Sequence, residues 1–530
     1  MRRPLGIFLW ALGLCVASVP RIADAAPPKL VVLVSVDQLS AHQVERWAPL
    51  LQGGLGRLLR QGAFYPQARY AYANTETAPG HATLSTGAWP SSHGIVANYW
   101  YAEGSGRETY CYEDPRFGRS PANLNAPTLA DALRLATAGR GKVVSISLKD
   151  RAAIPMGGQR PDLAAWYDEP SGRMVAGAWP GTNKPAWFEG AVVGMGADSA
   201  LGQPWDRSRP DLDYSAWAGP DDHPAEKDVP GLGRTFPRRM PEDMAQDVLR
   251  HIYPTHPKAL DNLFELVKVA VDKEALGRHE VPDLLAIGVT TTDYVGHWWG
   301  GYSHEALDAL LRVDAHLGAL FDALDRTLGR GRVLIVLSAD HGTTPTPEKA
   351  PLLGMSALRV SKDRLMGAAQ AVLPTGARVQ DIDAPAVYLA PTAPGVDRLA
   401  LARKVAAALT AEEGVVEAHA PADVARFPEP FATFFARSLF VGRRPDVQLR
   451  VVPHAYISKV DAEGRGVGSG HGSPYLYDQS VPVLLAGPGV RAGVDRRPVD
   501  MTRVAPTVAA LLGIPPPAAA YDAPLPAADP

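Results

Sequence analysis

The sequence has little cysteine, little net charge and, beyond its first residues, no long apolar run. Only two of its 530 residues are cysteines, Cys15 and Cys111. Cys15 lies in an N-terminal segment that we expect to be removed, so the mature chain has no internal disulfide pair and is not a disulfide scaffold. The formal net charge of −3 gives no indication of a surface that binds nucleic acid. The later apolar runs are too short to cross a bilayer, so we expect no transmembrane segment in the mature chain.

The N-terminus has the pattern of a secretory signal peptide over residues 1–25. Two arginines follow Met1, the stretch 5–19 is apolar, and Ala23-Asp24-Ala25 fits a small-x-small cleavage site. The alternative is an uncleaved membrane anchor, which the shortness of the apolar stretch disfavours. The sequence therefore predicts a periplasmic or secreted protein whose mature part spans residues 26–530.

Apolar runs alternate with helical patterns through most of the remaining chain. Continuous apolar runs suit strands that are buried on both faces of a parallel sheet, and apolar residues at helical spacing suit helices packed against it. The alternation predicts an α/β fold with a mostly parallel central sheet flanked by helices. Strands are expected at 29–37, 142–148, 283–289, 332–338 and 481–485, and helices at 43–61, 127–138, 241–272, 303–328 and 504–512.

Two long ranges break this alternation. From about 155 to 240 the sequence is rich in Pro, Gly, Trp and Asp and is too long for an ordinary loop, so we expect an ordered insertion near the functional site. From about 355 to 465 short strands alternate with helices, which favours a small inserted subdomain. We interpret both ranges as cap segments inserted into one domain.

A short hydroxyl-rich stretch, residues 74–87, carries a candidate nucleophile, Thr77. The stretch contains Pro79 and two glycines, which mark the end of a strand or the start of a helix. A hydroxyl nucleophile needs such a setting, because a tight turn exposes the side chain and the first helical turn offers free N–H groups and a positive dipole. A helix cap is the alternative role for Thr77, and Thr75 is a rival nucleophile by its chemistry.

Acidic residues and histidines follow the expected buried strands. Because the carboxyl ends of parallel strands meet at one edge of a sheet, the three strand-ending carboxylates should converge, and cations would offset their repulsion and lost hydration. Each histidine taken singly could have a structural role, but nitrogen and oxygen ligands without cysteine favour zinc over magnesium or calcium. The carboxylates are Asp37, Asp293 and Asp340, and the histidines are His297, His341 and His471.

Five motifs carry these residues: Val-Asp-Gln at 36–38, Thr-Ala-Pro-Gly-His at 77–81, Thr-Asp-Tyr-Val-Gly-His at 292–297, Ala-Asp-His-Gly at 339–342 and Gly-His-Gly at 470–472. Together they resemble the alkaline phosphatase superfamily, in the branch of bacterial zinc phosphatases that use a threonine nucleophile. That branch is close in its motifs to the nucleotide pyrophosphatase/phosphodiesterases. The resemblance runs from residue 29 to residue 514, and it implies one alkaline phosphatase-like catalytic domain over residues 26–530.

The resemblance implies two zinc ions and a covalent mechanism. One zinc would be held by Asp293, His297 and His471, and the other by Asp37, Asp340 and His341, with Thr77 as its fourth ligand. A zinc-bound threonine loses its proton more easily than a free one. A phosphothreonine would form at Thr77, and water would then hydrolyse it.

The residues that contact phosphate decide between monoesters and diesters. A monoester dianion has more non-bridging charge, so a monoesterase benefits from extra donors and cations. The family's monoesterases resemble this sequence in having an Asn and a Lys-x-Arg pair, here Asn98, Lys149 and Arg151. A solvated strand end is the alternative role for the lysine and the arginine.

The function expected from these features is hydrolysis of small-molecule phosphate monoesters, an alkaline phosphatase activity. A phosphodiesterase or nucleotide pyrophosphatase of the same superfamily is the first alternative. A non-catalytic protein that binds in a zinc-dependent way is the second, and it would be marked by a missing ligand or nucleophile. Each motif position holds its expected residue.

Overall fold

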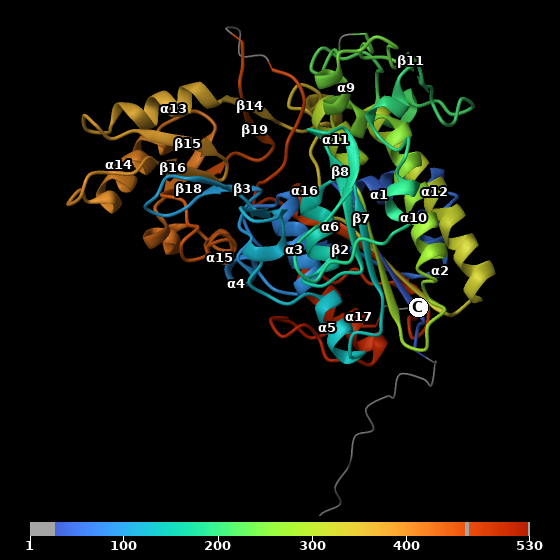
Figure 1. Cartoon of the computed structure of the whole chain (residues 1–530). Helices are drawn as coiled ribbons and strands as arrows, with labels where there is room; N and C mark the ends of the chain where they lie inside the picture. Colours follow the sequence, from blue (N-terminus) through green and yellow to red (C-terminus); the bar gives the residue numbers. More distant parts are fainter. Residues whose placement is uncertain (1–26, 230, 462–465, 528–530) are drawn as a thin grey trace, which may run out of the picture.

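The computed structural model describes residues 27–229, 231–461 and 466–527, and the signal peptide predicted at residues 1–25 lies outside them. A ten-stranded sheet forms the centre of this part of the chain (Figure 1). Its strands are β1 (Leu30–Val36), β2 (Ala63–Arg69), β7 (Val143–Ser147), β8 (Leu163–Asp168), β9 (Arg173–Ala176), β12 (Asp283–Val289), β13 (Val333–Ser338), β20 (Ser480–Ala486), β21 (Gly493–Val494) and β22 (Val499–Asp500).

The sheet has the order β21-β2-β20-β13-β1-β12-β7-β8-β9, with β22 also beside β2. The central strands β13, β1, β12, β7 and β8 pair in parallel, whereas β20 and β9 run antiparallel to their neighbours β13 and β8. Every residue of β1, β12 and β13 is buried, as expected for strands covered on both faces. The mostly parallel α/β fold expected from the sequence is confirmed.

Helices cover both faces of the sheet (Figure 1). One group packs against β7, β12, β13 and β20, and the other lies on the opposite face around β7, β8 and β12. Apolar side chains of both groups and of the sheet share one core. The first group is α1 (Ala41–Trp47), α2 (Gly54–Gln61), α10 (Pro257–Lys273) and α12 (His304–Leu328), and the second is α3 (Thr77–Thr86), α5 (Leu129–Ala136), α6 (Asp150–Gly157) and α17 (Val504–Leu512).

The register of the central strands brings three chain segments to one edge of the sheet. The last residue of β1, Val36, pairs with Val289 at the end of β12, and Ser35 pairs with Ser338 at the end of β13. The residues that follow these three strands therefore leave the sheet side by side. This edge is where ligands bind in parallel α/β sheets.

The single helix expected over residues 43–61 is wrong. The structure has α1, a short 3₁₀ turn over Ala48–Leu50, and then α2. Pro49 is the second residue of the 3₁₀ turn, and its ring removes a backbone donor that a continuous helix needs. The helices expected near 127–138, 303–328 and 504–512 are present as α5, α12 and α17.

Within the range 155–240, β8 and β9 extend the central sheet, and the chain leaves the sheet only after them. The limits of this range as an insertion stay a prediction. The short elements that follow β9 are α7 (Phe188–Ala191), β10 (Pro204–Trp205), α8 (Ser215–Ala218), β11 (Arg238–Arg239) and α9 (Gln246–Ile252).

Other short elements lie outside this range of the chain. They are α4 (Pro90–His93), β3 (Tyr99–Tyr101), β4 (Glu108–Tyr110), β5 (Glu113–Asp114), β6 (Gly118–Arg119), α11 (Thr291–Trp299) and α16 (Leu476–Gln479).

Residues 355–461 form a lobe beside the main sheet, drawn in orange in Figure 1. We name this lobe the inserted subdomain after the prediction from the sequence, and its status as an insertion stays a prediction. Much of this segment packs around a second hydrophobic core of its own. Its elements are β14 (Leu358–Ser361), α13 (Lys362–Ala371), β15 (Val379–Asp383), β16 (Ala386–Leu389), α14 (Arg398–Thr410), β17 (Val415–His419), α15 (Phe431–Arg437), β18 (Val447–Val451) and β19 (Ala455–Ser458). Among the described residues, no helix has the length and apolar character that crossing a membrane requires.

Candidate active site

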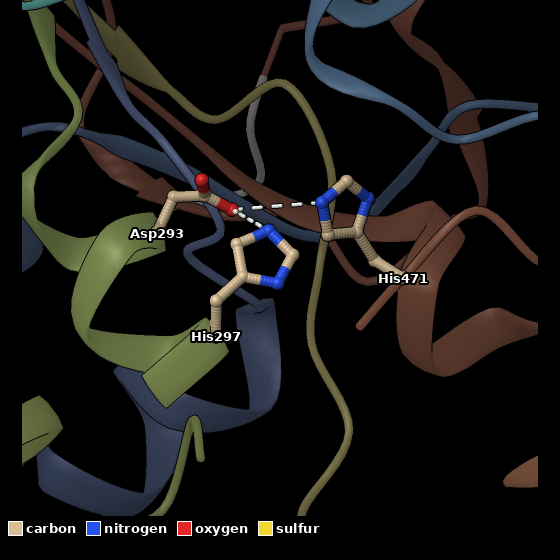
Figure 2. Close-up of side chains that lie close together, drawn as sticks. All are labelled: Asp293, His297 and His471. Carbon is tan, nitrogen blue, oxygen red and sulfur yellow. Dashed lines mark ion pairs between the residues drawn. The ribbon is translucent and has the colours of Figure 1, made fainter. Parts of the chain in front are cut away.

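Asp293, His297 and His471 form the first of two groups of metal-ligand type (Figure 2). Asp293 and His297 lie one turn apart on α11, directly after β12, and His471 comes from the loop before α16. The Oδ1 atom of Asp293 lies 3.3 Å from His297 Nε2 and 3.5 Å from His471 Nε2. One carboxylate oxygen and two imidazole nitrogens thus face the same point.

Asp37, Asp340 and His341 form the second group, and all three are fully buried. His341 Nε2 lies 3.5 Å from Asp37 Oδ1 and 3.4 Å from Asp340 Oδ2. These three atoms have no hydrogen-bond partner among the described residues. Since buried polar atoms are nearly always paired, their convergence fits a bound cation. The two groups adjoin, because the rings of His341 and His471 stack with centroids 3.5 Å apart.

Each of the three histidines donates its Nδ1 proton to a backbone carbonyl oxygen. A carbonyl only accepts, so in the neutral form of each ring this bond fixes the tautomer and leaves the lone pair of Nε2 free, as a metal-ligating imidazole requires. The bonds are His297 to Ser469 at 2.9 Å, His341 to Gly342 at 3.0 Å and His471 to Thr75 at 2.8 Å.

Burial and like charge set the protonation of this cluster. Burial lowers the pKa of His341 to about 3 and that of His471 to about 4, so both imidazoles are neutral near pH 7. Burial, reinforced by the charges of Asp293 and Asp340, holds the pKa of Asp37 well above its ordinary value. The crowded carboxylates are therefore costly to ionise together, and cations at the two groups would remove that cost.

Thr77 is the first residue of α3 and is 1% exposed. Its Oγ1 lies 3.5 Å from Lys149 Nζ. The helix sits directly against the second ligand group, because a Cβ at Gly80 would lie only 2.1 Å from the carbonyl oxygen of Asp340. Only glycine allows this approach, which holds the first turn of α3 over Asp340.

The rival nucleophile Thr75 has a supporting position. Its hydroxyl donates to the carbonyl oxygen of Ser473 at 3.0 Å, and its own carbonyl accepts from His471. These two bonds tie the segment before α3 to the loop that carries His471.

Lys149 lies between the two ligand groups and is 2% exposed, so it is not a solvated strand end. Its Nζ donates to Asp37 Oδ2 at 2.8 Å and also contacts Asp293 Oδ2. Burial lowers the pKa of Lys149, but the charges of Asp293 and Asp37 outweigh burial and raise it above its ordinary value. The ammonium is therefore a fixed positive charge beside Thr77.

Asn98 contacts the start of α3 beside Thr77, and Arg151 follows Lys149 by two residues. The Oδ1 atom of Asn98 accepts from the backbone N–H of Ala78 in the first turn of α3, at 2.9 Å. Arg151, in the first turn of α6, is partly buried, and its Nε has no hydrogen-bond partner among the described residues. The structure thus brings together the residues that the sequence singled out, and their roles stay predictions.

Two residues contact the ligand groups in ways that sequence reasoning did not assign, and one of them, Gln38, links the two groups. Gln38 donates its Nε2 to Asp293 Oδ1 at 3.0 Å and its backbone N–H to Asp340 Oδ1 at 3.1 Å. His81 Nδ1 lies 2.9 Å from the carbonyl oxygen of Thr77 and 3.3 Å from Asp340 Oδ2. The available signal was position, since Gln38 follows a strand-ending aspartate and His81 follows Thr77 by one helical turn.

Comparison with known proteins adds an independent finding. Residues 31–431 match the family described as "Type I phosphodiesterase / nucleotide pyrophosphatase". The chain is 28% identical to alkaline phosphatase PafA of Elizabethkingia meningoseptica, over 97% of this chain and 98% of that protein. It is 31% identical to alkaline phosphatase PhoK of a Sphingomonas species, over 94% and 90%. A crystal structure of PafA superposes with a TM-score of 0.82 at 27% identity, covering 94% of this chain and 98% of that one.

Proposed function

The chain belongs to the type I phosphodiesterase/nucleotide pyrophosphatase family and is a phosphoester hydrolase, and from that premise we propose that it acts as an alkaline phosphatase on small-molecule phosphate monoesters. The observation that carries the proposal is the position of Lys149. Its buried ammonium contacts a carboxylate of each ligand group and lies 3.5 Å from the hydroxyl of Thr77. A phosphoryl group next to Thr77 would meet this fixed charge.

We propose that two zinc ions bind, one at Asp293, His297 and His471 and the other at Asp37, Asp340 and His341 together with Thr77. Three imidazoles with free Nε2 lone pairs and three carboxylates, without thiolate, are a donor set that suits zinc. The unpartnered buried atoms of the second group support the same assignment. When bound, the ions would supply Lewis-acid stabilisation of the attacking and leaving oxygens.

Thr77 is the proposed nucleophile. Its hydroxyl gives up its proton, and its oxygen bonds to phosphorus while the bond from phosphorus to the ester oxygen breaks. The departing oxygen takes up a proton, so an alcohol leaves and a phosphothreonine remains. Water then attacks phosphorus and the bond to Thr77 breaks; a proton of the water returns to the Thr77 oxygen, and inorganic phosphate leaves. Lys149 favours both steps, since a positive charge held in place stabilises the charge that develops on the phosphoryl oxygens.

Asn98, Lys149 and Arg151 are the proposed phosphate contacts. Together they offer two positive charges and an amide, which matches the charge of a monoester dianion better than that of a diester monoanion. A solved PafA mutant, 28% identical to this chain with a TM-score of 0.84, carries replacements of a threonine, an asparagine, a lysine and an arginine. Those residue types are the same as the four in our proposal.

The test is phosphorylation of the enzyme itself. Thr77→Ala should lower turnover of an aryl phosphate by on the order of 10³ or more and abolish the phosphopeptide that mass spectrometry detects after acid quench. Thr75→Ala is the matched control, and it should keep a phosphopeptide at residue 77. Phosphorylation or full turnover in Thr77→Ala would refute the proposal.

One observation favours diesterase activity as a second candidate. A cavity of about 470 Å³ adjoins Lys149 and Arg151 and is walled by Tyr99, Tyr110 and Tyr294. It lies on the side of the proposed phosphate contacts, where the second substituent of a diester would be placed. A ratio of kcat/KM for an aryl phosphate and its diester that favours the diester would support this candidate.

We also propose that the protein is exported, to the periplasm or the medium. The support is the pattern of the N-terminal 25 residues. The check is N-terminal sequencing of protein recovered from the periplasm and the medium, which should begin near Ala26.

A further inference from the structure

A small cavity opens beside His471, between the loop that carries this residue and the inserted subdomain. Its volume is about 120 Å³, well below the roughly 300 Å³ at which sites for drug-sized ligands begin. Residues 470–474 line one side, and Lys362, Asp383 and Tyr456 are among the residues that line the other. A substituent that enters this cavity is therefore small.

The cavity lies on the side toward which the alcohol would depart in the proposed reaction. In an in-line displacement the ester oxygen departs on the side opposite the attacking oxygen. Thr77 belongs with the group of Asp37, so the alcohol departs toward the group that contains His471. His471 is both a member of that group and part of the cavity wall.

The inserted subdomain also reaches the segment before Thr77. A Cβ at Gly472 would lie 3.5 Å from the carbonyl oxygen of Ala384 and 3.8 Å from Cγ of Glu76. Residues of three separate segments therefore meet within contact distance next to the cavity. A group bound there is within reach of the phosphate ester.

The residues that line the cavity include a hydrogen-bond donor, a hydrogen-bond acceptor and an aromatic ring. Lys362 supplies an ammonium, which lies 2.8 Å from Asp381, and Asp383 supplies an exposed carboxylate. The ring of Tyr456 packs on the backbone beside His471, because a Cβ at Gly470 would lie 2.3 Å from it. Adjacent hydroxyls, which both donate and accept, are the groups that such a set recognises.

We propose that this cavity is the subsite for the alcohol part of the substrate and that it selects small polyhydroxy alcohols of the size of glycerol. Asp383 accepts a hydrogen bond from one hydroxyl, and Lys362 donates to another. The inference rests on the proposed monoesterase function, and it assigns a specificity role to the inserted subdomain.

Binding to the zinc-loaded Thr77→Ala protein tests this subsite without turnover. Calorimetry would compare glycerol 3-phosphate, methyl phosphate and inorganic phosphate, which share the phosphoryl group and differ in what it carries. We expect glycerol 3-phosphate to bind more tightly than methyl phosphate. Adding Asp383→Asn or Lys362→Met to the Thr77→Ala protein should lower its affinity for glycerol 3-phosphate about tenfold. The affinities for methyl phosphate and inorganic phosphate should change by less than about twofold.

The matched control is Asp363→Asn, an exposed carboxylate next to Lys362 that does not line the cavity, and it should leave all three affinities unchanged. Equal affinity for glycerol 3-phosphate and methyl phosphate would overturn the inference. So would variants that weaken all three ligands equally, because they would then act on the phosphate site. If inorganic phosphate itself does not bind, the proposed function fails, and the inference fails with it.

Discussion

Lys149 is the residue whose structural position adds most to its predicted role. The sequence predicts a phosphate contact, and the structure places its ammonium on Asp37 and Asp293 as well. We expect the double variant Lys149→Ala, Arg151→Ala to lose on the order of 10²-fold or more in kcat/KM for an aryl phosphate. Its loss for the matching diester should be much smaller, because a diester has less non-bridging charge to stabilise. Steady-state kinetics on the two substrates measures this.

Lys184→Ala is the control for that experiment, since this lysine is half exposed and pairs with the exposed carboxylate of Glu189. It should leave both substrates unaffected. Equal losses for monoester and diester in the double variant would argue that Lys149 and Arg151 stabilise the fold and do not select the substrate.

At the level of single residues, the sequence predicted which side chains meet but not how they are held. The ligand residues could be found because each follows a buried strand or stands in a short motif. The bond from Gln38 to Asp293 could not, since it depends on a left-handed backbone at Gln38, with φ 64°. Such a conformation has no periodic signature in the sequence.

At the level of elements, the break between α1 and α2 shows why the local sequence pattern wrongly predicted one continuous helix over residues 43–61. The carboxylate of Asp314, on α12, accepts the backbone N–H groups of Gln52 at 2.8 Å, Gly53 at 2.6 Å and Gly56 at 3.1 Å. A Cβ at Gly53 would lie 2.1 Å from the carbonyl oxygen of Asp314. A partner more than 250 residues away thus begins α2, and helical periodicity cannot reveal it.

Asp314→Ala should therefore destabilise the protein by about 2–4 kcal/mol, because it leaves one buried and two partly buried backbone donors without an acceptor. Denaturant midpoints of the purified variants provide the measurement. Asp322→Ala on the same helix is the control: this side chain is 67% exposed, and its removal should cost less than about 0.5 kcal/mol. Similar midpoints for the two variants would contradict the assigned role of Asp314.

His256 gives α10 a pH-dependent cap. Its Nδ1 accepts from the backbone N–H of Lys258 at 3.1 Å, and burial, followed by the charge of Arg312, lowers its pKa from 6.5 to about 4. As pH falls from 6.5 towards 4, the unfolded chain takes up a proton that the folded protein does not. The stabilising contribution of His256 is therefore fully present above pH 6.5 and is lost as the pH falls through this window. Between pH 6.5 and 5 the loss from this group is about 2 kcal/mol.

His256→Asn removes this titration and keeps a good helix cap. Unfolding free energies of the variant and the wild type at pH 7 and pH 5 should show a smaller decline for the variant. An equal decline in both proteins would mean that other groups carry the acid sensitivity.

At the level of the whole molecule, the five adjacent strands β20, β13, β1, β12 and β7 followed from the sequence, whereas the outer strands and the segments that cross the edge of the sheet did not. Residues 225–227, in the range expected as an insertion, contact both ligand segments. The carbonyl of Ala225 accepts from Gly468 N–H at 2.8 Å, and Lys227 N–H donates to the carbonyl of Trp298 at 2.9 Å. These bonds hold the loop of His471 and the end of α11 in place. They join irregular backbone, which has no periodic spacing of apolar residues that a sequence pattern could reveal.

The buried carboxylates at this edge of the sheet should make the stability of the whole protein depend on the proposed metal ions. The carboxylates of Asp37, Asp293 and Asp340 are at most 2% exposed, and burial together with mutual repulsion raises the pKa of Asp37 and Asp340. Ions that bind the folded chain and not the unfolded one stabilise it by mass action, by about 4 kcal/mol when free metal exceeds Kd about a thousandfold. Removing metal with a chelator should therefore lower Tm by several degrees.

Scanning calorimetry after chelation and after addition of zinc or magnesium tests this dependence. Zinc should restore Tm, and magnesium should restore less, because imidazole ligands suit zinc. Asp340→Asn should lose the part of the zinc-dependent gain that the second group supplies, since it removes one carboxylate of that group and leaves the first group intact. Thr77→Ala should keep the gain supplied by the six other ligands while losing turnover, which separates metal binding from catalysis. A Tm that is unaffected by the chelator would refute the metal assignment, because a buried cluster of this charge cannot gain and lose two divalent cations without a change in stability.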